Sequence, residues 1–150
     1  MNDVRPESIA ELPVALRLPV QWGEQDALGH VNNVVYFRWF ESARIEYLNL
    51  LDIEHIGKQS QLGPILAATT CNYRRQIHFP DTVWVTASVD RVGRSSMVVA
   101  HTVYSERRAA IVAEGTATTV LFDYVAQRPV RIPGELLKRL EQIEGRSFTS

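Results

Sequence analysis

The chain has 150 residues, of which 45% are hydrophobic and 22% are charged, and its formal net charge is -1 at pH 7. This composition is that of an ordinary globular protein, and the balanced charge argues against nucleic acid and membrane surfaces as partners. The single cysteine, Cys71, excludes an internal disulfide and a multi-cysteine metal site. Because no apolar segment is long enough to span a bilayer and no secretory signal is visible, we expect one cytoplasmic domain over residues 1–150.

The first half of the chain predicts a lead-in, a strand and a long helix. Residues 1–13 are polar with scattered prolines and predict a loose lead-in, and residues 15–22 (ALRLPVQW) predict a first strand. From Val34 to Leu51 apolar side chains recur at helical spacing. The apolar arc holds Tyr36, Trp39, Phe40, Ala43, Tyr47, Leu50 and Leu51, and the polar stripe opposite it holds Arg38, Ser42, Glu46 and Asn49. Glu41 lies on a second apolar ridge, with Val34, Phe37, Ile45 and Leu48.

The second half changes to a period of two, which is typical of strands. Alternating residues from Ile65 to Phe79 predict one long, half-buried strand with Cys71 on its inward face. The turn FPDT, the turn GRSS and the charged turn ERR then separate strands over residues 83–93, 97–105 and 109–124. A short amphipathic helix is expected over residues 133–145. Tight turns imply an antiparallel meander, so we predict an α+β fold in which a five-stranded antiparallel sheet wraps around a long central helix.

Several segments resemble one enzyme family. The segment WGEQDALGHVNNVVYFRWFESAR is similar to the signature of the hotdog-fold acyl-CoA thioesterases of the 4-hydroxybenzoyl-CoA thioesterase type. The segments CNYRRQIHFPDTVWV, AEGTATTVLFD and RPVRIP resemble later segments of that family, so the resemblance covers roughly Leu16 to Leu140. It implies a hydrolase that releases a free carboxylic acid and coenzyme A from an acyl-CoA substrate and needs no cofactor.

The resemblance also implies catalytic positions. Asp26, in GEQDALGH, occupies the place of the family's catalytic carboxylate and would attack the thioester carbonyl or activate a water. His30 matches the histidine of the related DxNxHVNN pattern of plant acyl-ACP thioesterases, although Leu28 replaces the asparagine of that pattern. The backbone N–H near Asn33 would face the carbonyl, because a helix N-terminus offers unpaired N–H groups and a positive dipole end. Glu24 stands where the family often has a second aspartate, and we assign it no chemical role.

Other candidate residues each have a structural alternative. The expected substrate-binding residues are Asn32, Tyr36, Glu41, Arg74, Arg75 and Arg94. The arginines, together with Arg91, would hold the phosphates of coenzyme A, or simply form a solvated strand edge and turn. Asn32 or Asn33 would equally serve as a helix N-cap, and Glu41 would either line the acyl or water pocket or pair with a neighbouring arginine of its helix. Cys71 is expected to be a small core residue and not a nucleophile, and without an HxxH or HExxH motif we predict no metal.

The predicted sheet has unpaired edges, which bears on assembly. A sheet with unpaired edges invites pairing with another copy, and the family places its site between one subunit's helix start and the other's strands, so we expect a homodimer or homotetramer. The alternatives are a hotdog dehydratase, for which no second segment with a histidine and a carboxylate is visible, and a non-catalytic acyl-CoA sensor. Hotdog regulators carry an added DNA-binding segment, for which the lead-in before Leu16 is too short. The acyl chain is not determined by the pattern.

Overall fold

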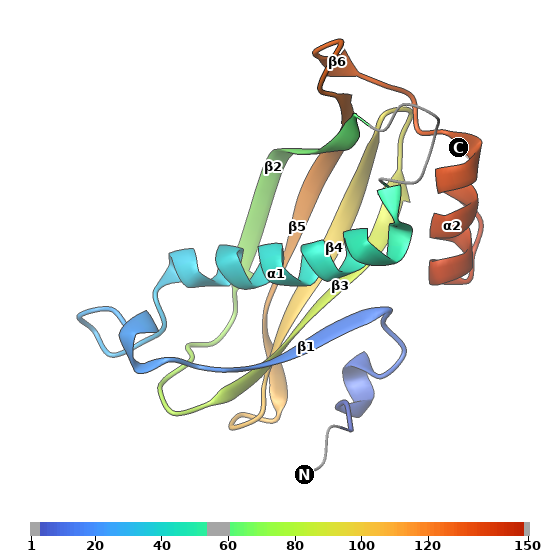
Figure 1. Cartoon of the computed structure of the whole chain (residues 1–150). Coiled ribbons are helices and arrows are strands. Elements are labelled where there is room, and N and C mark those ends of the chain that lie inside the picture. The colour runs from blue at the N-terminus through green and yellow to red at the C-terminus, as the bar shows by residue number, and fades with distance from the viewer. Residues whose placement is uncertain (1–3, 54–60, 149–150) are drawn as a thin grey trace.

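The computed structural model describes residues 4–53 and 61–148, which form one antiparallel sheet, two α-helices and two 3-10 turns (Figure 1). The elements in chain order are η1 (Glu7–Ile9), β1 (Val14–Pro19), η2 (Trp22–Glu24), α1 (Asn33–Leu51), β2 (Leu62–Tyr73), β3 (Thr82–Val92), β4 (Ser96–Ser105), β5 (Ala110–Asp123), β6 (Arg128–Pro129) and α2 (Gly134–Glu144). Helix α1 crosses one face of the sheet, and α2 lies beside the C-terminal end of α1 (Figure 1). The predicted α+β class with five main strands and one long helix is confirmed.

The strand order differs from the predicted meander. The order in the sheet is β1-β3-β4-β5-β2, and the two-residue β6 adds to β5. Strand β2 therefore pairs with β5, with Tyr73 opposite Ala113, and not with β3, its neighbour in sequence. Residues 74–81 form a connection that is long enough to carry the chain from β2, at one edge of the sheet, to β3, which lies next to the opposite edge strand β1. A tight turn would have kept β2 beside β3.

The predicted half-buried strand from Ile65 to Phe79 is also wrong in two respects. Strand β2 ends at Tyr73, and residues 66–70 are exposed on both faces. A register shift between Leu66 and Ala68 breaks the alternation, and β2, as an edge strand, pairs with a neighbour on one side only. Cys71 is half-buried, so its burial is less complete than a core position would require.

Helix α1 buries one face only. Of the predicted apolar arc, Tyr36, Trp39, Phe40, Ala43, Tyr47 and Leu51 are buried, whereas Leu50 is exposed. The second ridge is partly open, since Val34 is 62% and Ile45 50% exposed, whereas Phe37 and Leu48 are half-buried against the core. The sheet therefore wraps around the face of α1 that carries the apolar arc and leaves part of the opposite face open. A single chain leaves an apolar strip of α1 in contact with solvent.

The two ends of the chain are ordered as far as the structure describes them. The lead-in is less loose than predicted, because residues 7–9 form the 3-10 turn η1 and Ile9 is 1% exposed. Helix α2 begins after Pro133 and ends at Glu144, and the next residue, Gly145, has a φ of 68°, the left-handed conformation common at helix C-termini. Residues 1–3 lie outside the described part.

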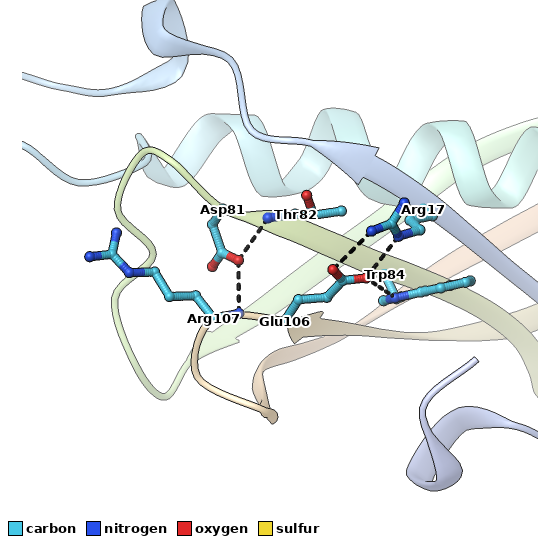
Figure 2. A network of polar contacts seen from close by, with 6 residues as sticks. All are labelled: Arg17, Asp81, Thr82, Trp84, Glu106 and Arg107. Atoms are coloured by element: carbon cyan, nitrogen blue, oxygen red, sulfur yellow. Dashed lines mark hydrogen bonds and ion pairs between the residues drawn. The ribbon is translucent and has the colours of Figure 1, made fainter. Parts of the chain in front are cut away.

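A polar network fixes the end of the sheet at the turn between β4 and β5 (Figure 2). Glu106 accepts hydrogen bonds from Arg17 of β1, at 2.8 and 3.0 Å, and from Trp84 Nε1 of β3, at 2.7 Å. Asp81 Oδ1 accepts from the Arg107 N–H at 3.0 Å. Because these bonds join β1, β3 and the turn, they anchor the point where the long connection of residues 74–81 enters the sheet.

Candidate active site

The segment around Asp26 folds into a tight turn held by its own backbone and by one carboxylate oxygen. The Asp26 N–H donates to His30 O at 2.7 Å, and Asp26 Oδ1 accepts from the N–H groups of Leu28, at 2.9 Å, and His30, at 3.3 Å. Gly29 takes a φ of 83°, which glycine tolerates best. Among residues 4–53 and 61–148, no hydrogen bond engages Asp26 Oδ2. One carboxylate oxygen, Oδ1, therefore stabilises the turn, and Oδ2 is free to contact a substrate or a water.

The start of α1 follows within a few residues. Asn32 is the N-cap, and its side chain accepts from the Val34 N–H at 3.0 Å. The Asn32 carbonyl accepts from the Val35 N–H at 3.0 Å. Within the described residues, nothing accepts the N–H of Asn33. The helix thus begins with one free donor, the backbone N–H that the family resemblance expects to face the carbonyl oxygen of a substrate.

One cleft of about 460 Å³ collects most of the predicted residues. Its lining consists of Asp26, His30, Val31, Asn33, Tyr36, Tyr73, Arg74, Arg75 and Gln76. Two distant parts of the chain meet here, the turn with the helix start and the segment after β2. The Val31 N–H, donating to Ile77 O at 2.8 Å, joins the two parts.

The far wall of the cleft is held from β5 and from the turn between β4 and β5. The N–H groups of Arg74 and Arg75 both donate to Val112 O, at 2.8 and 3.1 Å. Arg108 Nε donates to Gln76 O at 2.7 Å. The guanidinium of Arg74 is paired with Glu114, with Nε 3.0 Å from Oε1. In the described ranges no side chain or carbonyl pairs with the Arg75 guanidinium, so it is the freer cation at the cleft.

The side chain of His30 packs against His78 and makes no hydrogen bond to Asp26 within the described residues. The hydrogen bonds between His30 and Asp26 run through the backbone of His30. The His30 ring packs edge-on against the ring of His78, with centroids 5.3 Å apart. His78 Nδ1 lies 3.0 Å from Gly29 O and, because a carbonyl only accepts, it donates there.

Two tyrosines, Tyr36 and Tyr73, also line the cleft. Tyr36 is 3% exposed, and burial raises the pKa of its hydroxyl well above the usual range. Tyr73 packs edge-on against Tyr36, with centroids 4.9 Å apart, and burial raises its pKa to about 12. Burial also raises the pKa of the Cys71 thiol beside them, so it stays protonated and is a poor nucleophile. Sequence reasoning missed Tyr73 because alternation alone marked it as one more inward strand residue.

Three predicted residues lie elsewhere or serve the fold. The Asn32 side chain caps α1, which is the structural alternative. Glu41 is exposed on α1 and does not line the cleft. Arg94 follows β3, whose 11 residues span roughly 33 Å at about 3.3 Å each, so it lies at the opposite end of the sheet. There it lines a second cleft of about 540 Å³ with Arg131, Ile132 and Leu137.

Glu24 is explained by the fold, since its carboxylate accepts from the Gln21 N–H at 2.6 Å and its carbonyl from the Asn32 N–H at 2.9 Å. In the described part of the chain, no three His, Cys, Asp or Glu side chains gather as a metal site would require. No described helix has the length and hydropathy needed to cross a membrane.

Comparison with known proteins identifies the family. The sequence profile of the thioesterase-like superfamily matches residues 20–140, so the chain belongs to this superfamily and is a thioesterase. The long-chain acyl-CoA thioesterase FadM of Escherichia coli is 26% identical over 118 residues, which are 79% of this chain and 89% of that protein.

Solved structures agree with this assignment. A Thermus thermophilus thioesterase, complexed with coenzyme A and Zn, shares 29% identity with a TM-score of 0.78 over 91% of this chain and 97% of that chain. A thioesterase superfamily protein from a Jannaschia species shares 26% identity with the same TM-score of 0.78, over 88% of this chain and 83% of that chain. The predicted hotdog fold and thioesterase family are therefore confirmed.

Proposed function

We propose that the cleft hydrolyses acyl-CoA thioesters to a free carboxylic acid and coenzyme A, with Asp26 as the reacting carboxylate. The observation that carries the proposal is that Asp26 and Asn33 line the same cleft, and that within the described residues neither Asp26 Oδ2 nor the Asn33 N–H has a hydrogen-bond partner. Coenzyme A as the thiol is supported by the names of the relatives, an acyl-CoA thioesterase and a thioesterase complexed with coenzyme A.

Two courses use the same geometry. As a general base, Asp26 Oδ2 accepts a proton from water while the water oxygen bonds to the carbonyl carbon; the C–S bond then breaks and the thiolate takes up a proton. As a nucleophile, Oδ2 itself bonds to the carbonyl carbon, the thiolate leaves, and water hydrolyses the resulting anhydride. In both courses negative charge develops on the carbonyl oxygen. The Asn33 N–H, at the positive end of a 19-residue helix, stabilises that charge.

The remaining cleft residues bind and orient the substrate. Arg75, whose guanidinium has no partner in the described ranges, is better placed than Arg74 to hold a phosphate, because Arg74 must first release Glu114. His30, packed on His78, borders the carboxylate and assists in positioning or in proton transfer. Tyr36 lines the cleft, and its buried hydroxyl stays protonated, so its ring contacts the acyl group without adding a charge.

The complete site requires a second subunit. Two exposed surfaces support a two-fold dimer, doubled in a tetramer. Strand β2 is an edge strand exposed on both faces, and the second ridge of α1 is exposed at Val34 and Ile45. Arg94 is too far from Asp26 to serve the same substrate within one chain, so it reaches coenzyme A only from a partner. Glu41 lies between Val34 and Ile45 on that ridge and borders an acyl pocket only once a partner covers it. The cytoplasmic location stays a prediction.

The test is release of free thiol from a panel of short, long, branched and aromatic acyl-CoAs. Asp26→Asn keeps the shape and the turn but removes the charge, so kcat should fall by roughly 10²- to 10⁴-fold. Asp123→Asn is the matched control, because Asp123 Oδ1 caps a similar turn by accepting from the N–H groups of Val125 and Ala126 at 2.9 and 3.0 Å. Near-normal turnover by Asp26→Asn would remove this carboxylate from the mechanism.

A further inference from the structure

Tyr73 is hydrogen-bonded to Asn33, the residue whose backbone N–H is proposed to bind the developing oxyanion. It is the last residue of β2 and lines the cleft with Asp26 and Asn33. Its hydroxyl donates a hydrogen bond of 2.9 Å to the carbonyl oxygen of Asn33. This bond joins an edge strand to the first residue of α1, which stands 40 positions earlier in the chain.

The first turn of a helix has few bonds of its own, and this one is held from two sides. The Asn32 side chain takes up the Val34 N–H, which restrains the turn from the preceding loop. The Tyr73 hydroxyl restrains it from the sheet. Since the carbonyl and the N–H of Asn33 flank the same Cα, a fixed carbonyl also limits how far the N–H can rotate away from the cleft.

The side-chain packing and the protonation of Tyr73 both maintain its hydrogen bond to Asn33. The Tyr73 ring packs edge-on against Tyr36, with centroids 4.9 Å apart, and this limits rotation of the side chain. The hydroxyl is a donor here, because a carbonyl only accepts. It remains a donor across the neutral and mildly alkaline range, since burial raises its pKa to about 12.

We propose that Tyr73 is a positioning residue for thioester hydrolysis, whose hydroxyl holds the start of α1 so that the Asn33 N–H meets the developing oxyanion. The proposal rests on the oxyanion role proposed above for Asn33. Tyr73 acts through Asn33 and makes no bond to the reacting atoms. The orientation of the donor thereby depends on the position of β2, the strand whose outer edge is open.

The test removes single atoms. Tyr73→Phe deletes the hydroxyl and keeps the ring, and kcat should fall roughly 3- to 10-fold, the effect of losing one hydrogen bond, with KM nearly unchanged. Tyr124→Phe is the matched control. Tyr124 also donates its hydroxyl to a backbone carbonyl, that of Pro64, at 2.8 Å, and the two tyrosines are 44% and 45% exposed. This control should keep the wild-type kcat.

The donor itself can be removed as well. Asn33→Pro deletes the N–H at the first helical position, where proline is accepted, and the Asn32 backbone (φ -61°, ψ 138°) already suits a residue before proline. Asn33→Ala is its reference, because it loses the same side chain and retains the N–H. Relative to Asn33→Ala, kcat of Asn33→Pro should fall by roughly 10²-fold or more.

The combination decides between positioning and a merely structural role. In the Asn33→Pro background, Tyr73→Phe should cost little further kcat, because the donor that it orients is gone. A full, multiplicative loss in that background would overturn the proposal. So would wild-type kcat in Tyr73→Phe, or a loss seen equally in Tyr124→Phe. If Asn33→Pro folds but keeps the kcat of Asn33→Ala, the oxyanion role fails, and Tyr73 with it. If Asn33→Pro does not fold, the kcat and KM of Tyr73→Phe against Tyr124→Phe decide.

Discussion

Replacing His101 with glutamine probes a buried polar contact beneath α1. His101 of β4 is 1% exposed, and its Nδ1 lies 2.8 Å from Thr86 O, so Nδ1 carries the proton and donates. Its Nε2 is then the acceptor facing Arg44 Nη1, 3.4 Å away. The ring stacks on Phe40 with centroids 4.7 Å apart. A protonated His101 would therefore place a second cation against a buried arginine.

The magnitude follows from the pKa of this histidine. Burial, with a smaller contribution from Arg44, lowers the pKa of His101 from 6.5 to about 4 in the folded protein. Between these values the unfolded chain binds the proton and the folded chain does not, so stability is full above 6.5 and falls as the pH drops towards 4. This difference corresponds to roughly 3 kcal/mol of unfolding free energy, at about 1.4 kcal/mol for each tenfold change in proton affinity.

The assay is urea unfolding at several pH values between neutrality and about pH 4. Glutamine can donate to Thr86 O and accept from Arg44 but does not titrate in this range. His101→Gln should lose some stability near pH 7, because stacking on Phe40 is lost, at about 0.5–1.5 kcal/mol. Its stability should then decline less on acidification than that of the wild type, by up to roughly 3 kcal/mol.

Parallel declines of the wild type and His101→Gln would refute this reasoning, since carboxylates contribute equally to both. Arg44→Met serves as a second variant. It removes the neighbouring charge and keeps a flexible apolar side chain, so the pKa of His101 should rise and the acid sensitivity should lie between those of the other two proteins.

Three further outcomes are expected. Gly115→Ala should lower the unfolding free energy by about 1–3 kcal/mol, because the added Cβ would lie 2.1 Å from Thr70 O; an unchanged urea midpoint would contradict this. His30→Ala should reduce kcat less than Asp26→Asn, and the double variant should lose less than the product of the two, whereas strictly multiplicative losses would argue against coupling. Ile45→Glu, on the open ridge of α1, should shift sedimentation towards the monomer and lower activity in parallel; a fully active monomer would exclude the shared site.

Patterns confined to neighbouring residues were readable from the sequence. Helix α1, predicted from Val34 to Leu51, spans Asn33–Leu51, because a sustained helical period leaves few alternatives. The turn at Asp26 and the start of α1 are also adjacent in sequence. This half of the candidate site could therefore be proposed from the sequence alone, although its chemical roles came from family resemblance.

Only the tertiary structure decided which residues face the Asp26 turn and the start of α1 across the cleft. The sequence pattern shows that β2 and β3 exist but not that β2 joins β5, because pairing depends on the length of the connection and on the packing of the whole sheet. That pairing brings Tyr73 to Asn33 and Arg75 to the cleft, and it leaves Arg94 at the other end. Local periodicity reports which face of an element is apolar, whereas contacts between distant residues arise only when all elements pack together.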